Sequence, residues 1–591
     1  MTDEQPITEL QKRSDAARGR NTVFFTLSSL AVVLGTIALM IAIFGATMLL
    51  MTYGRSLPGN EPHFKYGSIG AELANGLPYR IFTALPKVFP EKFGLTEAEA
   101  NALSRSEIGK AFKHFGMLYE PKDAGINKGL PIGFATGVRM GQEVVWFNCA
   151  ICHSGQVAKP DERKPDIHLG MPANTLNLER FFLALFDMAV DKRFSWSSEE
   201  FRKALGEDEL WWYERLIWQW AIVPYTRSVL LRRRSELLPL LDPKRAWSDV
   251  PLPAKLCKAY PETSTYRQNC GNLTRKEPPP YRRKRPLDMP TKWGAGRVDT
   301  FNPYKLIHFN MSADCLKPEE RIGFTDFPTI YLQGERAHQM MNLHWDGNNA
   351  SLKERNLSAA LGAGVSPETV RHAAIGRVAT WLNKLEPPKN PYYSADQLEQ
   401  DKAVLERGFG IYMKNCADCH GYYDLAGKSY RFAGSRLGKI EPIQHIQTDR
   451  GRLDSYTATM EMFQKNRLFC QTPQHRFSHF KKTNGYANMP LDGLWLRAPY
   501  LHNGSVPTLR DLLEKPAARP KMFVRGEVVL DAKNGGFIAP VCTGPLPSET
   551  TDLTRHCYDT TKEGNSNAGH DYGTSLSDAE KEDLLRYLMT F

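Results

Sequence analysis

One short motif of cysteine and histidine occurs twice in the chain, and this repetition constrains the fold more than any other feature. Residues 148–153 read NCAICH, and residues 415–420 read NCADCH. Two thiols separated by two residues match the two vinyl groups of a haem, and the imidazole that follows directly can bind the iron. Zinc sites need paired cysteine knuckles close together, and thioredoxin-type disulfides lack the histidine, so both alternatives fit less well.

The two motifs therefore predict two covalently bound haem c groups. The predicted haem-binding residues are Cys149, Cys152 and His153 at the first site and Cys416, Cys419 and His420 at the second. Each site indicates a cytochrome c-like core of helices and loops. The expected fold is mainly α, with two cytochrome c-like haem domains, long loops, an insertion and one N-terminal transmembrane helix.

The segment 23–53 carries no charged residue. At about thirty residues it exceeds the apolar core of a signal peptide and is long enough to span a bilayer. More basic residues precede this segment than follow it, so the positive-inside rule puts the N-terminus in the cytoplasm and the haem domains in the periplasm. The expected location is the inner membrane, in a single pass. An unusually long, cleaved signal peptide is the alternative.

Changes in composition and the positions of prolines divide the rest of the chain into regions. The expected organisation is a cytoplasmic tail (1–22), the anchor (23–53), a first haem c region (54–194), an insertion-like, loop-rich region (195–340), an inter-haem linking region with a helix (341–390) and a second cytochrome c domain (391–591). The net charge of +11 permits an acidic partner or an anionic membrane surface. No nucleic-acid-binding module is recognisable, so no nucleic-acid partner is expected.

Local patterns predict several helices. A helix within 405–424 should end at the second motif, and Ser366 with Pro367 should begin a helix over 366–388. The final helix should start at Ser577, which forms a capping-box pattern with Glu580. Aromatic residues at helical spacing in 211–234 indicate core packing or a membrane-facing surface rather than a cofactor site.

Six cysteines lie outside the two motifs, and an oxidising compartment would allow them to pair. The short-loop pairs Cys257 with Cys270 and Cys542 with Cys557 are plausible disulfides, and Cys315 with Cys470 is a possible third. Six cysteines allow fifteen connectivities, so the pairing stays open.

Several longer stretches resemble known di-haem proteins. Residues 493–513, GLWLRAPYLHNGSVPTLRDLL, resemble the C-terminal signature of the bacterial di-haem cytochrome c peroxidase and methylamine-utilisation peroxidase superfamily. Stretches that resemble the branch of rubber oxygenases and di-haem fatty-acid dioxygenases are 63–70, 296–305, 343–364 and 564–577. The resemblance covers most of the chain after residue 60 and is weakest in the middle insertion.

This resemblance implies different roles for the two haems. In that branch the N-terminal haem is open on one side for dioxygen, and the C-terminal haem, ligated on both faces, is an electron partner. His153 would then be the proximal ligand of the reactive haem and His420 that of the second. Trp345 would correspond to a tryptophan between the haems, with ordinary packing as its alternative role. His344, next to it, is a candidate hydrogen-bonding residue of the haem pocket.

The far ligand of the second haem has three candidates. Met489 follows His420 at a spacing usual for monohaem cytochromes, and His502 lies in the signature stretch. His570 precedes the final helix, as the far histidine of rubber oxygenases does, and is our choice. Calcium accompanies the haems of peroxidase relatives, but the sequence contains no recognisable calcium loop.

One departure from the rubber oxygenases bears on the substrate. They carry a phenylalanine beside the reactive iron in a stretch that matches residues 356–364, and here that stretch, NLSAALGAG, has no aromatic residue. The change disfavours polyisoprene and leaves fatty acids, other unsaturated lipids such as smaller isoprenoids, or another apolar substrate. The implied activity is addition of O2 to such a substrate. The alternatives are reduction of H2O2 with electrons from a partner cytochrome, and electron transfer without catalysis.

Overall fold

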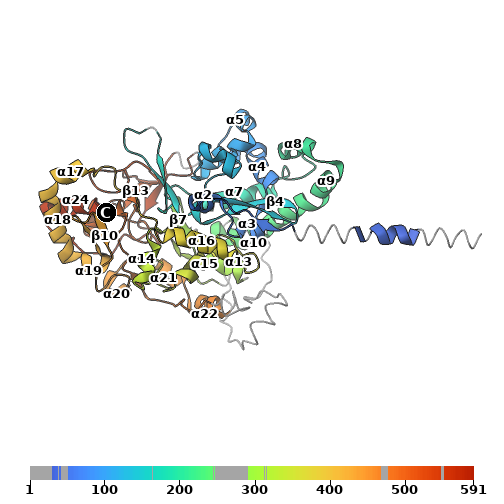
Figure 1. Cartoon of the computed structure of the whole chain (residues 1–591). Coiled ribbons are helices and arrows are strands. Elements are labelled where there is room, and N and C mark those ends of the chain that lie inside the picture. Colours follow the sequence, from blue (N-terminus) through green and yellow to red (C-terminus); the bar gives the residue numbers. More distant parts are fainter. Residues whose placement is uncertain are drawn as a thin grey trace, which may run out of the picture.

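The structure is a computed structural model that describes most of the chain (Figure 1). The described residues are 30–37, 39–40, 51–162, 164–243, 245–246, 291–309, 311, 313, 316–466, 477–547 and 552–591. The fold is mainly helical with small antiparallel sheets, so the predicted fold class is confirmed at that level. Across these residues, no helix combines the length and apolarity needed to cross a membrane. Most of the expected anchor at 23–53 lies outside them.

The N-terminal half combines a small sheet with short helices. Its sheet is antiparallel with strand order β1–β3–β4–β2, and its bounds are Tyr53–Gly54 (β1), Leu77–Pro78 (β2), Phe134–Arg139 (β3) and Gln142–Phe147 (β4). Its helices are α2 (Asn60–Tyr66), α3 (Ala71–Asn75), α4 (Tyr79–Val88), α5 (Glu97–Ala102), α6 (Ala124–Asn127), α7 (Leu178–Val190), α8 (Glu199–Leu205), α9 (Trp212–Ile217) and α10 (Val223–Leu241). A hairpin of β5 (Ser154–Val157) and β6 (Asp166–Leu169) follows the first motif.

Aromatic side chains fill the core of this half. The rings of Phe82 and Phe112 stack with centroids 4.4 Å apart, and Phe134 packs against both. Phe181 of α7 joins the same cluster through Phe112. These side chains come from α4, β3, α7 and the 3-10 helix Arg105–Phe115. Their burial therefore fixes β4 and the first motif against the helices.

The middle of the chain links the two halves and lies between them in Figure 1. It contains β7 (Arg297–Asp299), β8 (Phe324–Asp326), α13 (Asn302–His308), α14 (Gln333–His338), α15 (Leu352–Gly362) and α16 (His372–Leu382). The prediction that a helix starts at Ser366 was wrong. The Ser366 carbonyl accepts hydrogen bonds from the backbone N–H groups of Thr369 and Val370, which forms a turn. The Arg371 backbone N–H then bonds to Ile69, and α16 begins only at His372.

The C-terminal half surrounds the second motif with helices and short hairpins. Its helices are α17 (Ala395–Gln400), α18 (Lys402–Asn415), α19 (Ala417–His420), α20 (Ile443–Ile446), α21 (Gly451–Ser455), α22 (Ala458–Asn466), α23 (Leu509–Leu512) and α24 (Asp578–Leu588). Its strand pairs are β9 (Tyr422–Asp424) with β10 (Ser429–Arg431), β11 (Ile440–Pro442) with β12 (Gly485–Ala487), and β13 (Met522–Arg525) with β14 (His556–Asp559).

Two of the predicted helices cross at the centre of this half. The predicted helix before the second motif is confirmed as α18 followed by α19, and the capping box of Ser577 and Glu580 begins α24. A Cβ on Gly408 of α18 would lie 2.1 Å from the Asp583 carbonyl of α24, so only glycine allows this approach. Arg407 adds a pair of hydrogen bonds to the Asp583 carboxylate.

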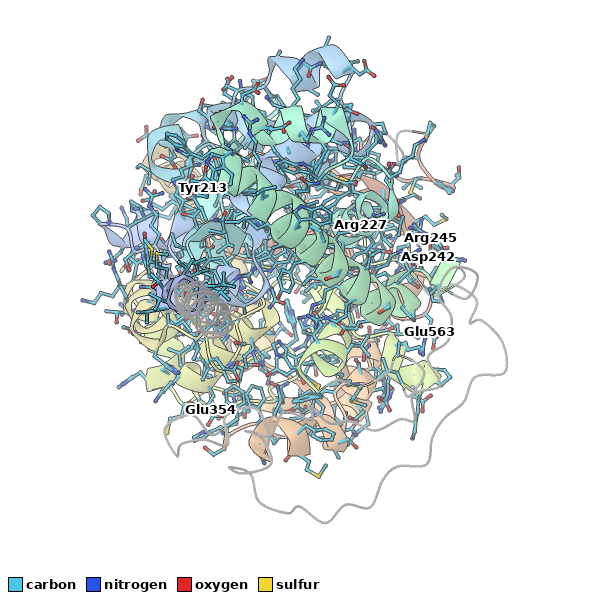
Figure 2. The ribbon with its side chains drawn as sticks, turned by 90° about the vertical axis from the view of Figure 1, so that its right-hand side faces the viewer. Tyr213, Arg227, Asp242, Arg245, Glu354 and Glu563 are labelled. Atoms are coloured by element: carbon cyan, nitrogen blue, oxygen red, sulfur yellow. A yellow bond between two sulfur atoms is a disulfide. The ribbon has the colours of Figure 1, made fainter. Side chains whose placement is uncertain are left out.

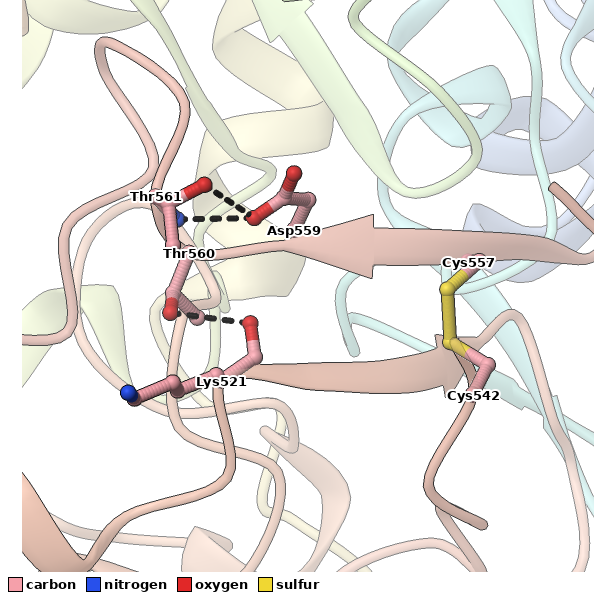
Figure 3. The surroundings of a disulfide bond; sticks show 6 residues. All are labelled: Lys521, Cys542, Cys557, Asp559, Thr560 and Thr561. Carbon is pink, nitrogen blue, oxygen red and sulfur yellow. Dashed lines mark hydrogen bonds between the residues drawn. A yellow bond between two sulfur atoms is a disulfide. The ribbon is translucent and has the colours of Figure 1, made fainter. Parts of the chain in front are cut away.

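One of the three proposed disulfides lies within the described residues, and it is confirmed. Cys557 of β14 is bonded to Cys542, with Cα atoms 6.0 Å apart (Figure 3). Nearby, the hydroxyls of Thr560 and Thr561 bond to the Lys521 carbonyl and the Asp559 carboxylate. The proposed pairs Cys257 with Cys270 and Cys315 with Cys470 lie outside the described residues.

Candidate functional site: two haem attachment motifs

The first motif follows strand β4 directly. The Asn148 side chain accepts a hydrogen bond from the Ala150 N–H and donates one to the Gly67 carbonyl, which fixes the turn that carries Cys149 and Cys152. His153 ends this turn, and its Nδ1 lies 2.9 Å from the Pro328 carbonyl oxygen. Since a carbonyl only accepts hydrogen bonds, Nδ1 carries the proton and Nε2 keeps its lone pair for a metal.

Burial keeps these groups uncharged. It lowers the pKa of His153 to about 3, and the positive charge of Arg355 adds to this effect. Burial also raises the pKa of the Cys149 thiol to about 11. Neutral imidazole is the form that binds iron, so the surroundings of His153 favour ligation at neutral pH.

A cavity of about 370 Å³ adjoins the first motif, and Cys149, Cys152 and His153 line it. Its other walls come mainly from aromatic and aliphatic side chains of α7, α10, α13 and α15. The sequence predicts that residues 356–364 lie beside the first site, and Ala359 from this stretch lines the cavity. Small side chains of α15 therefore face the cavity, whereas an aromatic side chain there would fill part of it. The first site is therefore adjacent to apolar space.

Polar side chains, several of them arginines, also line the mainly apolar cavity. His344 lines the cavity, with Nδ1 2.6 Å from Asn348 Oδ1, and burial lowers its pKa to about 4. Arg355 also lines it, and within the described part of the chain its guanidinium has no carboxylate partner and bonds weakly to Asn356 at 3.4 Å. Burial lowers the pKa of Arg355 to about 10, so the side chain stays cationic at neutral pH.

The second motif lies where α18 passes into α19. His420 has its Nδ1 2.7 Å from the Met489 carbonyl oxygen, so its Nε2 is also the nitrogen left for a metal. Burial lowers the pKa of His420 and raises that of the Cys416 thiol to about 12. The proximal side of the second site thus repeats that of the first.

A second imidazole lies opposite His420. The ring centroids of His420 and His570 are 6.2 Å apart. Two imidazoles that bind one metal ion through nitrogens at about 2 Å have ring centres roughly 6 Å apart, so the pair has room for one iron between its nitrogens. Burial and the nearby His420 lower the pKa of His570 to about 3, which again favours the neutral form.

The backbone holds His570 in an unusual conformation. Its φ of 52° lies in the left-handed region, which costs free energy for a residue other than glycine. The His570 N–H donates to the Ile446 carbonyl, and the Arg519 guanidinium donates to the carbonyls of Gly569 and His570. These contacts stabilise the conformation and keep the ring against His420.

The other two candidates for the far ligand make different contacts. The Met489 carbonyl bonds to Nδ1 of His420, the nitrogen that an iron would not use. His502 stacks on Tyr486 with ring centroids 4.1 Å apart, and its Nε2 is hydrogen-bonded to the Tyr486 hydroxyl at 2.9 Å. Of the three candidates, the ring contact with His420 is therefore made by His570.

The Trp345 side chain contacts the first cavity on one side and a hydrophobic cluster on the other. Its indole lines the cavity of the first site, and its Nε1–H donates to the Asp326 carbonyl at 2.9 Å. The same side chain packs against a cluster that contains Ile446, the residue whose carbonyl holds His570. Trp345 therefore lies against both the first cavity and a cluster next to the segment that holds His570.

Sequence reasoning missed three groups. Pro328 and Met489 act through backbone carbonyls, which no side-chain pattern can reveal. Arg355 gives no signal in the sequence either, because the lack of an acidic partner depends on the fold. For calcium, no group of three or more metal-binding side chains occurs among the described residues.

The residues at both motifs fit haem c. Each provides two thiols and a neutral histidine whose Nδ1 is fixed by a backbone carbonyl, which is the donor set that covalent haem attachment requires. At the first site the donors line a cavity, and at the second the opposed ring of His570 adds a further nitrogen.

Comparison with known proteins gives a partial assignment. A family described as "RoxA-like, cytochrome c-like" matches residues 485–524. Uncharacterized protein y4iM of Sinorhizobium fredii is 30% identical over 296 residues, which cover 45% of this chain and 64% of y4iM. Uncharacterized protein y4iJ of the same organism is 38% identical over 114 residues, or 18% of this chain and 17% of y4iJ. The chain thus spans less than two thirds of either relative.

The matched segment includes Met489 and His502 and ends within β13. The chain therefore contains a RoxA-like, cytochrome c-like domain, and such a domain implies covalently bound haem c.

Proposed function

We propose that the chain is a di-haem c-type oxidoreductase that adds O2 to an unsaturated apolar substrate, a fatty acid or an isoprenoid, at its first haem site. Residues 23–53 anchor it in the inner membrane, and the haem domains lie in the periplasm. The observation that carries the proposal is the apolar cavity of about 370 Å³ beside His153. A site that lies against apolar space can admit both a gas and a hydrocarbon chain.

The side chains at the first site have separate tasks. When bound, haem supplies an iron that takes up a small ligand and exchanges electrons. His153 would hold the group, and the Pro328 carbonyl fixes the ring of this histidine. The walls from α7 and α10 exclude water and pack against the substrate chain.

The second site is suited to electron transfer. His420 and His570 would each offer one nitrogen to a haem held at the second motif, and a group bound by both would have no protein-free face for a substrate. Trp345, which contacts the surroundings of both sites, is the candidate aromatic group between the haems. The geometry therefore supports one reactive site and one electron partner.

Reduction of H2O2 is a second candidate, favoured by two polar residues in the cavity. His344 is neutral at neutral pH because burial lowers its pKa to about 4, so it could accept a proton. The cationic Arg355 could stabilise negative charge that develops on a bound oxygen. Simple electron transfer, the third alternative, would require both irons to have two protein ligands.

Oxygen and peroxide consumption by the haem-loaded protein would test the proposal. Oleate, a short polyisoprene and a reduced cytochrome would be offered separately. We expect oxygen uptake that depends on an unsaturated lipid and needs no reductant. Peroxide consumption coupled to cytochrome oxidation would instead support the peroxidase. The variant His153→Ala should lose turnover while the spectrum of the second haem stays intact, and persistent turnover would refute the assignment of the reactive site.

A further inference from the structure

A long helical segment forms one side of the first cavity and also reaches the surface. It consists of α9, a π-helical turn at Trp218–Ile222 and α10. Trp218, Val223 and Leu230 point into the hydrophobic core of the N-terminal half. Figure 2 shows the segment running across one face of the molecule, from the region of Tyr213 past Arg227 to Asp242.

The opposite side of this segment is apolar although it is exposed. Trp211, Trp212 and Trp220 are 69%, 73% and 75% exposed. We define the outer face of α9–α10 by its exposed apolar residues Trp211, Trp212, Tyr213, Leu216, Ile217, Trp220, Tyr225 and Leu231. They recur at the spacing that puts side chains on one side of a helix, where a helix facing water normally carries polar residues.

Basic side chains accompany this outer face. Arg232 is exposed, and Arg215 and Arg227 are half-buried. Arg227 donates from Nε to the Ala189 carbonyl, and Arg215 donates from Nε to the Leu210 carbonyl, so neither of these two bonds neutralises a charge. Tryptophan and tyrosine beside arginine are typical of the interfacial region of a bilayer, where anionic head groups attract the cations.

The N-terminal segment enters the fold at the same face. The Met51 carbonyl accepts a hydrogen bond from the Gly141 N–H at the turn after β3, and Met51, Tyr53 and Met140 are all exposed. Arg139 precedes this turn and lines the same cavity as Tyr225 of α10. Residues 51–53, the last of the uncharged segment, therefore lie against β3 and the turn after it, next to Arg139.

The cavity of the first site also reaches this face. Tyr225 and Arg232 are exposed and line the same cavity as His153. Arg139, next to the N-terminal turn, lines it as well. The lining of the first cavity thus includes residues on or beside the outer face of α9–α10.

We propose that the outer face of α9–α10 docks on an anionic lipid bilayer, so that the cavity of the first site opens toward the lipid. Its tryptophans lie at the level of the head groups and acyl chains, and its arginines bind lipid phosphates. An apolar substrate can then enter the cavity from the membrane without crossing water. This last step rests on the proposed function, whereas the docking does not.

Lipid cross-linking tests the docking. The full-length, haem-loaded protein would be reconstituted into vesicles of phosphatidylcholine and phosphatidylglycerol that contain a photoactivatable phospholipid, and adducts would be mapped by mass spectrometry. We expect adducts on peptides that contain Trp211, Trp212 and Trp220. Peptides around Met340, which is 83% exposed, are the internal control and should stay free of adducts. Equal labelling of both sets, or adducts on the control alone, would overturn the proposal.

A surface variant separates docking from catalysis. Replacing Trp211, Trp212 and Trp220 together by serine should reduce the adducts severalfold and leave the haem spectra unchanged. Turnover of a vesicle-embedded lipid should fall severalfold, whereas turnover of a short, water-soluble unsaturated analogue should be preserved. If the variant loses neither adducts nor vesicle turnover, the outer face is not a docking surface. If wild-type adducts appear as expected but no lipid supports oxygen uptake, the docking stands and the proposed function fails.

Discussion

The two motifs are nearly identical in sequence, yet their surroundings differ on the far side of the histidine. His153 lines an apolar cavity, whereas His420 lies opposite the ring of His570, with centroids 6.2 Å apart. On the near side the two sites agree, because each Nδ1 bonds to a backbone carbonyl from a segment later in the chain. Each motif supplies two thiols and one histidine, while distant segments determine what faces that histidine: a cavity at His153 and a second imidazole at His420.

The largest expected effect concerns the attachment of each haem. The double variant Cys149→Ala with Cys152→Ala should lose one covalent haem and all turnover, because no thioether can form at the first site. The double variant Cys416→Ala with Cys419→Ala should lose the other. Haem staining of denaturing gels and intact-protein mass would measure the loss. Unchanged haem content in either variant would contradict a site at that motif.

The next test concerns the group that faces the motif histidine, because removing His570 should make the second site resemble the first. His570→Ala should leave the second iron with one protein ligand and convert its low-spin ferric signal to high spin, as measured by electron paramagnetic resonance. Met489→Leu and His502→Gln are the matched controls, because each replaces a rival candidate. If His502→Gln changes the spin state and His570→Ala does not, the assignment of the far ligand is wrong.

A smaller effect, on the reduction potential of the first haem, is expected when Arg355 is replaced. The positive charge of Arg355 helps to lower the pKa of His153. The same charge should disfavour the ferric over the ferrous state of an iron bound there, so Arg355→Gln should lower the first reduction potential. We expect a shift of about 60 mV, a tenfold change in equilibrium constant for one electron. The second haem is the internal control in a spectroelectrochemical titration. Equal shifts at both haems would show that Arg355 does not act locally.

The smallest expected effect is on stability and concerns His502, which lies near the second site but not against His420. Burial lowers the pKa of His502 from 6.5 to about 3. Between these values only the unfolded chain binds the proton, so the free energy of unfolding should decrease as the pH falls through this window. Above pH 6.5 both states are neutral, and His502 should not contribute to the pH dependence.

Denaturant unfolding at neutral pH and at a pH of about 5 would check this expectation. His502→Gln cannot titrate and should lose less stability on acidification than the wild type. His445→Gln is the matched control, since the side chain of His445 is 61% exposed. A wild-type decrease that persists unchanged in His502→Gln would refute the role of His502.

Local chemistry explains what could be predicted from the sequence. The spacing of the two motifs, the helix before Cys416, the capping box at Ser577 and the bonded pair Cys542 and Cys557 depend on residues close together in the chain. The start of α16 was missed because the Ile69 carbonyl, which binds the Arg371 N–H, comes from a segment far away in the sequence.

The sequence alone predicts two motifs for haem attachment and one histidine ligand in each, because these are properties of a few adjacent residues. Which nitrogen of each histidine is left for a metal follows from the fold, because the carbonyls of Pro328 and Met489 bond to Nδ1. Only the tertiary structure decided that α7, α10 and α15 enclose apolar space beside His153, and that Ile446 and Arg519 hold His570 against His420. It also decided that the aromatic residues of α9 and α10 face outward. Burial and long-range backbone hydrogen bonds exist only in the folded chain, and they distinguish two sites with the same motif.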